Sequence, residues 1–171
     1  MKAVVAVVST DALVFALLYQ VPAWVVGQLL KWLLPHPLVR AILLLPGTFV
    51  HEFLHLAIGL ILNGKPRSIS LWPRRVAHDQ WILGSVGFVN LCWYNAVFIG
   101  LAPLLAVAGL MVAAPSAQGW ALQVSDFQRW AVTAPILVMC MPSTVDLKLC
   151  LKSWPILVLL AVWGGWEIVK V

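Results

Sequence analysis

The apolar stretch over residues 38–62 constrains this chain more than any other part of its sequence. It is long enough for a helix that crosses the hydrocarbon core of a bilayer, which takes about 20 residues. Within it, His51, Glu52 and His55 form an H-E-x-x-H pattern. Ionisable groups are costly at membrane depth and are functional there by default. We therefore expect this helix to carry a site that is shielded from lipid.

The spacing of the H-E-x-x-H pattern points to metal chemistry. On a helix, His51 and His55 lie one turn apart on the same face. Two imidazoles in that relation can bind one Zn²⁺ ion, and Glu52 can then act as the general base on water at the metal. The alternative is a polar core network in which these side chains satisfy one another without a metal.

The composition places the whole chain in a membrane. Hydrophobic residues make up 63% of the sequence and charged residues 10%, and the mean hydropathy is +0.98. A soluble domain is nearer half apolar and a quarter charged. We expect an all-α polytopic membrane protein, with residues 1–171 as one membrane-embedded bundle of four to five transmembrane helices. The net charge of +5 is expected to set the orientation in the membrane and to contact anionic lipid headgroups. The sequence has no signature of nucleic-acid binding.

The apolar runs divide the chain into membrane segments. The predicted segments are 3–19, 38–62, 91–114, 130–141 and 154–169. Pro22 is expected to break or kink the chain after the first of them. Residues 21–34 are too short for a separate span and end in Lys31 and Trp32, which suits an interfacial or re-entrant helix.

The longest polar segment covers residues 65–80 and is strongly basic. By the positive-inside tendency it faces the cytoplasm, and we expect a multi-pass protein of a prokaryotic cytoplasmic membrane. Residues 67–72 alternate polar and apolar side chains, as a strand does, so a short β-hairpin or a re-entrant segment is expected in the 65–90 region. An ordinary basic loop is an equal alternative. A strand here would offer an edge to an extended peptide.

A zinc site with two histidines needs a third protein ligand and one open position. Asp146 is the preferred candidate because it lies in an apolar region just after Pro142, where a broken helix can bring a carboxylate into a buried site. Ser143 and Asp146 also form a capping-box pattern, so a purely structural role for Asp146 stays open. His78, in the basic segment, is the second choice.

The H-E-x-x-H helix, the basic segment, and Pro142 followed by Asp146 resemble the site-2 protease class of intramembrane zinc metallopeptidases. The likeness covers residues 38–150 and lacks a PDZ-like insert, so the chain resembles a minimal form. Members of that class usually carry Asn-x-x-Pro leading to Asp-Gly, whereas Met139 and Leu147 stand at the Asn and Gly positions here.

The resemblance implies a function. His51, His55 and Asp146 would hold Zn²⁺, and Glu52 would be the catalytic base for hydrolysis of peptide bonds in transmembrane or membrane-proximal polypeptides. The expected partners are such a polypeptide and the lipid bilayer, without nucleic acid. The alternative is a non-catalytic protein, either a metal-binding membrane scaffold or an inactive protease homologue that binds transmembrane helices.

Overall fold

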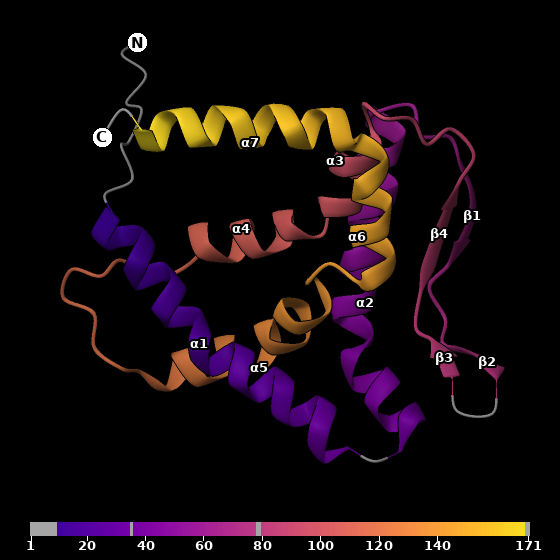
Figure 1. Cartoon of the computed structure of the whole chain (residues 1–171). Coiled ribbons are helices and arrows are strands. Elements are labelled where there is room, and N and C mark those ends of the chain that lie inside the picture. Colours follow the sequence, from indigo (N-terminus) through magenta and orange to yellow (C-terminus); the bar gives the residue numbers. More distant parts are fainter. Residues whose placement is uncertain (1–9, 35, 78–79, 170–171) are drawn as a thin grey trace, which may run out of the picture.

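The computed structural model of the protein describes residues 10–34, 36–77 and 80–169. This part of the chain is mostly helical and contains two small antiparallel pairs of strands (Figure 1). The helices are α1 (Thr10–Leu33), α2 (Pro37–Ile61), α3 (Ala96–Leu101), α4 (Leu104–Val112), α5 (Val124–Met139), α6 (Thr144–Cys150) and α7 (Trp154–Val169), with a 3-10 turn, η1 (Leu151–Ser153). The strands are β1 (Pro66–Ser70), β2 (Arg74–Ala77), β3 (Gln80–Ile82) and β4 (Ser85–Phe88).

Helices α1 and α2 are the two in the described part of the chain that are long and apolar enough to cross a membrane. Helix α2 confirms the helix predicted over residues 38–62. Of the two effects predicted for Pro22, the break is wrong, because this proline lies inside α1, which continues to Leu33. The separate interfacial or re-entrant helix predicted over residues 21–34 is wrong for the same reason. A proline removes only one backbone donor, and an apolar helix tolerates that loss when a neighbour packs along it, as α5 does here. The start of the first predicted segment lies outside the described residues.

The predicted span over residues 91–114 is not one continuous helix. Helix α3 ends at Leu101 and α4 begins at Leu104, with Pro103 between them lacking the N–H that would extend the hydrogen-bond ladder. Helices α5 and α7 have 16 residues each, fewer than the roughly 20 that cross a bilayer without thinning it. The described chain is therefore a helical protein with two long apolar helices, and the larger bundle stays a prediction.

Helix α5 lies in close contact with both long helices because two glycines make room for it. A Cβ atom at Gly27 of α1 would clash with the Val138 side chain of α5. A Cβ atom at Gly47 of α2 would clash with the backbone carbonyl of Pro135, also in α5. Small residues allow this kind of backbone approach between apolar helices. The chain that leaves α5 then leads directly into α6 (Figure 1).

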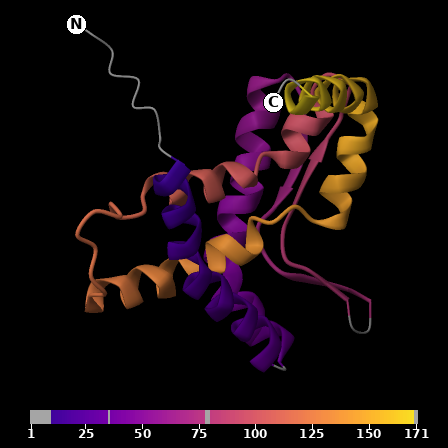
Figure 2. The ribbon, with the colours of Figure 1, turned by 60° about the vertical axis from the view of Figure 1, so that its left-hand side comes forward.

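The basic segment folds into strands, as its period-two pattern predicted, and the ordinary-loop alternative is wrong. Strand β1 pairs antiparallel with β4, with Ser68 opposite Gly87 and Ser70 opposite Ser85. Strands β2 and β3 continue the same hairpin to its tip. Figures 1 and 2 show the hairpin standing beside α2 and α6. Strand β4 contacts α2, and its second edge has no strand partner among the described residues.

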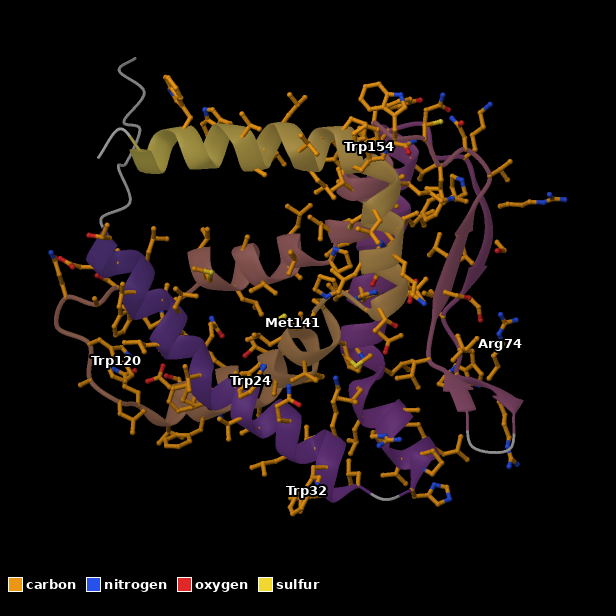
Figure 3. The ribbon with its side chains drawn as sticks, viewed as in Figure 1. Trp24, Trp32, Arg74, Trp120, Met141 and Trp154 are labelled. Atoms are coloured by element: carbon orange, nitrogen blue, oxygen red, sulfur yellow. The ribbon has the colours of Figure 1, made fainter. Side chains whose placement is uncertain are left out.

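Many large apolar side chains are exposed on the helices, and several polar side chains are buried. The buried polar side chains include Thr48, Asn95 and Asp126, whereas large apolar side chains are exposed over α1, α2 and α7. Trp32 and Trp154 project at opposite ends of the molecule (Figure 3) and are 80% and 66% exposed. The interior also holds apolar side chains such as Leu44 and Ile99, and an exposed apolar surface of this kind is stable where lipid replaces water as the solvent.

Candidate metal centre

Helix α2 turns its polar side chains inward and its aromatic side chains outward. His51, Glu52 and His55 are 8%, 7% and 5% exposed. Phe49 and Phe53, on the opposite side of the same turns, are 52% and 53% exposed. This division follows from the helical period, which brings residues four apart to one face. The two imidazoles therefore meet inside the protein, with their ring centroids 4.6 Å apart.

Asp146 reaches the two histidines from the first turn of α6. Its Oδ1 lies 3.2 Å from His55 Nε2, and its Oδ2 lies 3.5 Å from His51 Nε2. The same carboxylate closes a capping box, because Oδ2 accepts a 2.7 Å hydrogen bond from the Ser143 N–H and the Ser143 hydroxyl accepts one from the Asp146 N–H. The capping role of Asp146 is thus confirmed, and the same carboxylate lies where a third ligand would be needed.

The geometry of the three side chains fits a divalent cation. The Nε2 atoms of His51 and His55 lie 3.0 Å apart, and the carboxylate oxygens of Asp146 lie 3.2 and 3.5 Å from them. Ligand atoms held at about 2.0–2.1 Å in a tetrahedron around zinc are about 3.4 Å from one another. All three residues are buried, so the group can hold a metal ion.

The two histidines differ in how their rings are fixed. His55 Nδ1 lies 2.7 Å from the carbonyl oxygen of Ile99 in α3. A carbonyl oxygen only accepts, so Nδ1 carries a proton. Nε2 donates to Asp146 when the ring is protonated and offers its lone pair to the site when that second proton leaves. His51 Nδ1 is buried without a partner among the described residues. The main-chain oxygen of Ile99 carries no sequence signal, and sequence reasoning did not find it.

The charge on Asp146 is maintained by its hydrogen bonds. Burial favours the neutral carboxyl, but the hydrogen bonds from His51, His55 and Ser143 outweigh it and hold the pKa of Asp146 well below its ordinary value. An ionised carboxylate is the form that coordinates a metal. The capping contact from Ser143 therefore orients the oxygen atoms and also keeps them charged.

The site opens on a cavity of about 980 Å³ between α2, the hairpin and α6. Glu52, Asp146 and both histidines line it, as do the residues of β4. At the start of β4, Gly84 lies so close to α2 that a Cβ atom there would be 2.7 Å from Glu52 Cγ and 2.9 Å from Glu52 Oε1. Sequence reasoning missed this contact, since Gly84 lies in an apolar stretch of the 65–90 region, where the pattern predicted only a hairpin or a re-entrant segment.

His78, the second choice for the third ligand, lies outside the described residues. Asn95 is completely buried, donates to the carbonyls of Leu62 and Asn90, and accepts from the Cys92 N–H, so its amide is engaged in holding the chain before α3. Asn95 therefore has a structural role away from the cavity.

Comparison of the chain with family models, with curated proteins and with solved structures finds no match. The interpretation of the site therefore depends on the residues and the geometry described above.

Proposed function

We propose that this protein is an intramembrane zinc metalloprotease that hydrolyses peptide bonds of transmembrane or membrane-proximal polypeptides. The observation that carries the proposal is the buried group of His51, His55 and Asp146 with Glu52 beside it, all lining one cavity. The resemblance of the H-E-x-x-H helix and the later Pro142 and Asp146 to the site-2 protease class supports the same function.

Zinc is the proposed metal because of the donor set. Two imidazole nitrogens and one carboxylate, arranged with tetrahedral spacing, suit Zn²⁺ and leave one coordination position open. When bound, zinc would supply Lewis acidity, polarising a peptide carbonyl and lowering the pKa of water. Because His51, His55 and Asp146 are buried, electrostatic interactions among them are screened less than they would be in water.

Glu52 is the proposed general base. It follows His51 directly on α2, and it is buried, with 7% of the residue exposed. The close approach of Gly84 limits the positions that its side chain can take. A base held in this way can accept a proton from water inside the cavity and pass it to the departing amine.

The second edge of β4 is the proposed place for the substrate. Ser85, Gly87 and Phe88 line the cavity, and this edge of the strand has no strand partner in the described chain. An unwound peptide that pairs there would satisfy its backbone groups as an added strand. A peptide bond must leave its helix before cleavage, because the helical turn shields its carbonyl.

The proposal is tested by Glu52→Gln in the purified full-length protein. We expect the variant to retain stoichiometric zinc, because Glu52 is not a ligand, and to cleave membrane-embedded test polypeptides at least about 100-fold more slowly, the effect of losing a general base. Glu167→Gln, at the only other glutamate in the sequence, is the matched control. Cleavage by Glu52→Gln at the wild-type rate would reject the role of Glu52. Zinc binding without any cleavage by the wild type would instead favour the metal-binding scaffold.

A further inference from the structure

The wall of the cavity opposite β4 carries positive charge. Lys148 and Lys152, together with Val145 and Leu149, place one face of α6 and η1 against the cavity. Both lysines are exposed, and neither forms an ion pair with a residue in the described part of the chain. The carboxylates that line the same cavity, Glu52 and Asp146, are engaged in the candidate metal centre. The two lysines are therefore available to a charged ligand.

The contacts along the cavity fix the relative direction of its walls. Gly84 at the start of β4 lies against Glu52, and Phe88 at its end lies against Gly59, so β4 runs in the same direction as α2. Figure 1 shows that α6 also runs in this direction and ends at the start of α7. Lys148 in α6 and then Lys152 in η1 lie progressively farther along the chain from Asp146 toward that end.

The spacing of the lysines matches an extended chain. Residues four apart on a helix are separated by about 6 Å along its axis. Side chains two apart on a strand point to the same side and are separated by about 6.6 Å. A peptide lying between β4 and α6 therefore presents alternate side chains to Lys148 and Lys152. A peptide that pairs antiparallel with β4, the commoner arrangement for a short strand pair, has its N-terminal part toward Phe88 and Lys152.

We propose that Lys148 and Lys152 select substrates with two acidic side chains, at alternate positions on the N-terminal side of the cleaved bond. The inference rests on the proposed function and adds the substrate class. The scissile bond lies near Glu52 and Gly84, and the acidic residues lie along α6 beyond Asp146. An anionic lipid headgroup is the other ligand that two exposed lysines could attract.

The experiment compares matched peptides. Cleavage sites of the purified zinc-loaded full-length protein are first mapped on a degenerate peptide library in neutral detergent. Two versions of a cleaved peptide are then made, with Glu-x-Glu or Gln-x-Gln N-terminal to the bond. We expect the wild type to prefer the acidic version about tenfold in kcat/KM, mainly through KM, as two partly solvated ion pairs would give.

The variant Lys148→Gln/Lys152→Gln should lose this preference, so that it cleaves the acidic and the neutral peptide with equal kcat/KM. Lys65→Gln/Arg67→Gln, which removes the same charge from exposed positions outside the cavity lining, should retain the preference. Lys148→Glu/Lys152→Glu should favour a Lys-x-Lys peptide, a reversal that a folding defect would not produce. Zinc content and thermal unfolding verify that each variant is folded.

Three results would overturn the inference. Equal cleavage of acidic and neutral peptides by the wild type would reject the charge selection and leave the protease function standing. A lysine effect that appears only in anionic vesicles, and equally for both peptides, would assign the lysines to lipid. Absence of cleavage of any peptide by the zinc-loaded wild type would reject the proposed function together with this inference.

Discussion

Two buried aspartates occupy the same local structure in different parts of the molecule. Asp126 in α5 and Asp146 in α6 are each the third residue of a helix, and each accepts a hydrogen bond from the backbone N–H three residues earlier, at 2.9 and 2.7 Å. They are 3% and 8% exposed. A local description of the chain would treat them as equivalent capping residues.

Asp126 and Asp146 differ in the side chains that they contact on other helices. Asp126 Oδ1 accepts a 2.6 Å hydrogen bond from the Tyr19 hydroxyl of α1, which satisfies the carboxylate with one neutral donor. Asp146 instead meets the Nε2 atoms of His51 and His55, groups that can exchange a proton for a metal. The capping box thus positions the carboxylate, and the partner from a distant helix decides whether it lies against a tyrosine or within the candidate metal centre.

The largest expected difference is in metal binding. Asp146→Asn should lower zinc affinity at least about 100-fold and abolish cleavage, because an amide replaces a charged ligand. Asp126→Asn should leave zinc stoichiometry unchanged, since its carboxylate contacts Tyr19 rather than the histidines. Zinc affinity is measured by competition with a chelator. Full zinc binding by Asp146→Asn would remove the functional distinction between the two aspartates.

A smaller effect is expected at the structural aspartate. Tyr19→Phe leaves Asp126 Oδ1 buried without its donor, which should destabilise the protein by about 1–3 kcal/mol. Zinc affinity should not change. Thermal unfolding in detergent measures the stability, and Tyr94→Phe, at a tyrosine that is 44% exposed, is the matched control. Equal stability of the two variants would show that the contact between Tyr19 and Asp126 contributes little.

The capping box of α6 should couple stability to metal binding. Ser143→Ala removes the hydroxyl that accepts from the Asp146 N–H, and should cost about 1 kcal/mol in stability. Because the same box orients the Asp146 carboxylate, zinc affinity should also fall several-fold. Isothermal titration with zinc and thermal unfolding are compared on one preparation. A loss of stability with unchanged zinc affinity would show that His51 and His55 orient Asp146 without the cap.

The smallest expected effect is on acid stability. The Tyr19 hydroxyl and the Gln123 N–H hold the pKa of Asp126 below its ordinary value of 3.8. A carboxyl with a lowered pKa stabilises the fold above its ordinary pKa, and this contribution is lost as the pH falls through the folded-state pKa. The metal-free wild type should therefore lose more stability than Asp126→Asn as the pH falls below about 4. Parallel pH dependence of both melting temperatures would contradict this.

The sequence predicted the features that depend on local pattern. The apolar run predicted α2, the H-E-x-x-H spacing predicted the inward pair of histidines, and the alternation over residues 67–72 predicted β1. The sequence could not decide between a capping role and a ligand role for Asp146. The same residues serve both roles, and only the helix that packs opposite Asp146 differs.

Features that depend on packing were not predictable from local pattern. Pro22 favoured a break, but the packing of α5 along α1 maintains one helix through it. The approach of Gly84 to Glu52 and of the Ile99 carbonyl to His55 joins segments more than thirty residues apart, and neither position carries a distinctive residue type. Such contacts are determined by the tertiary packing of distant segments and not by local sequence.

The glycine at position 47 has a consequence for coordination. Gly47 allows α5 to lie directly against α2, and the chain that leaves α5 at Met139 carries Asp146 a few residues later. A methyl group at position 47 would clash with the Pro135 carbonyl, so we expect it to separate α2 from α5 and to move the Asp146 carboxylate away from His51 and His55. Gly47, one turn before His51 in α2, thus controls whether a metal ion would have three protein ligands or two, although Gly47 is not itself a ligand.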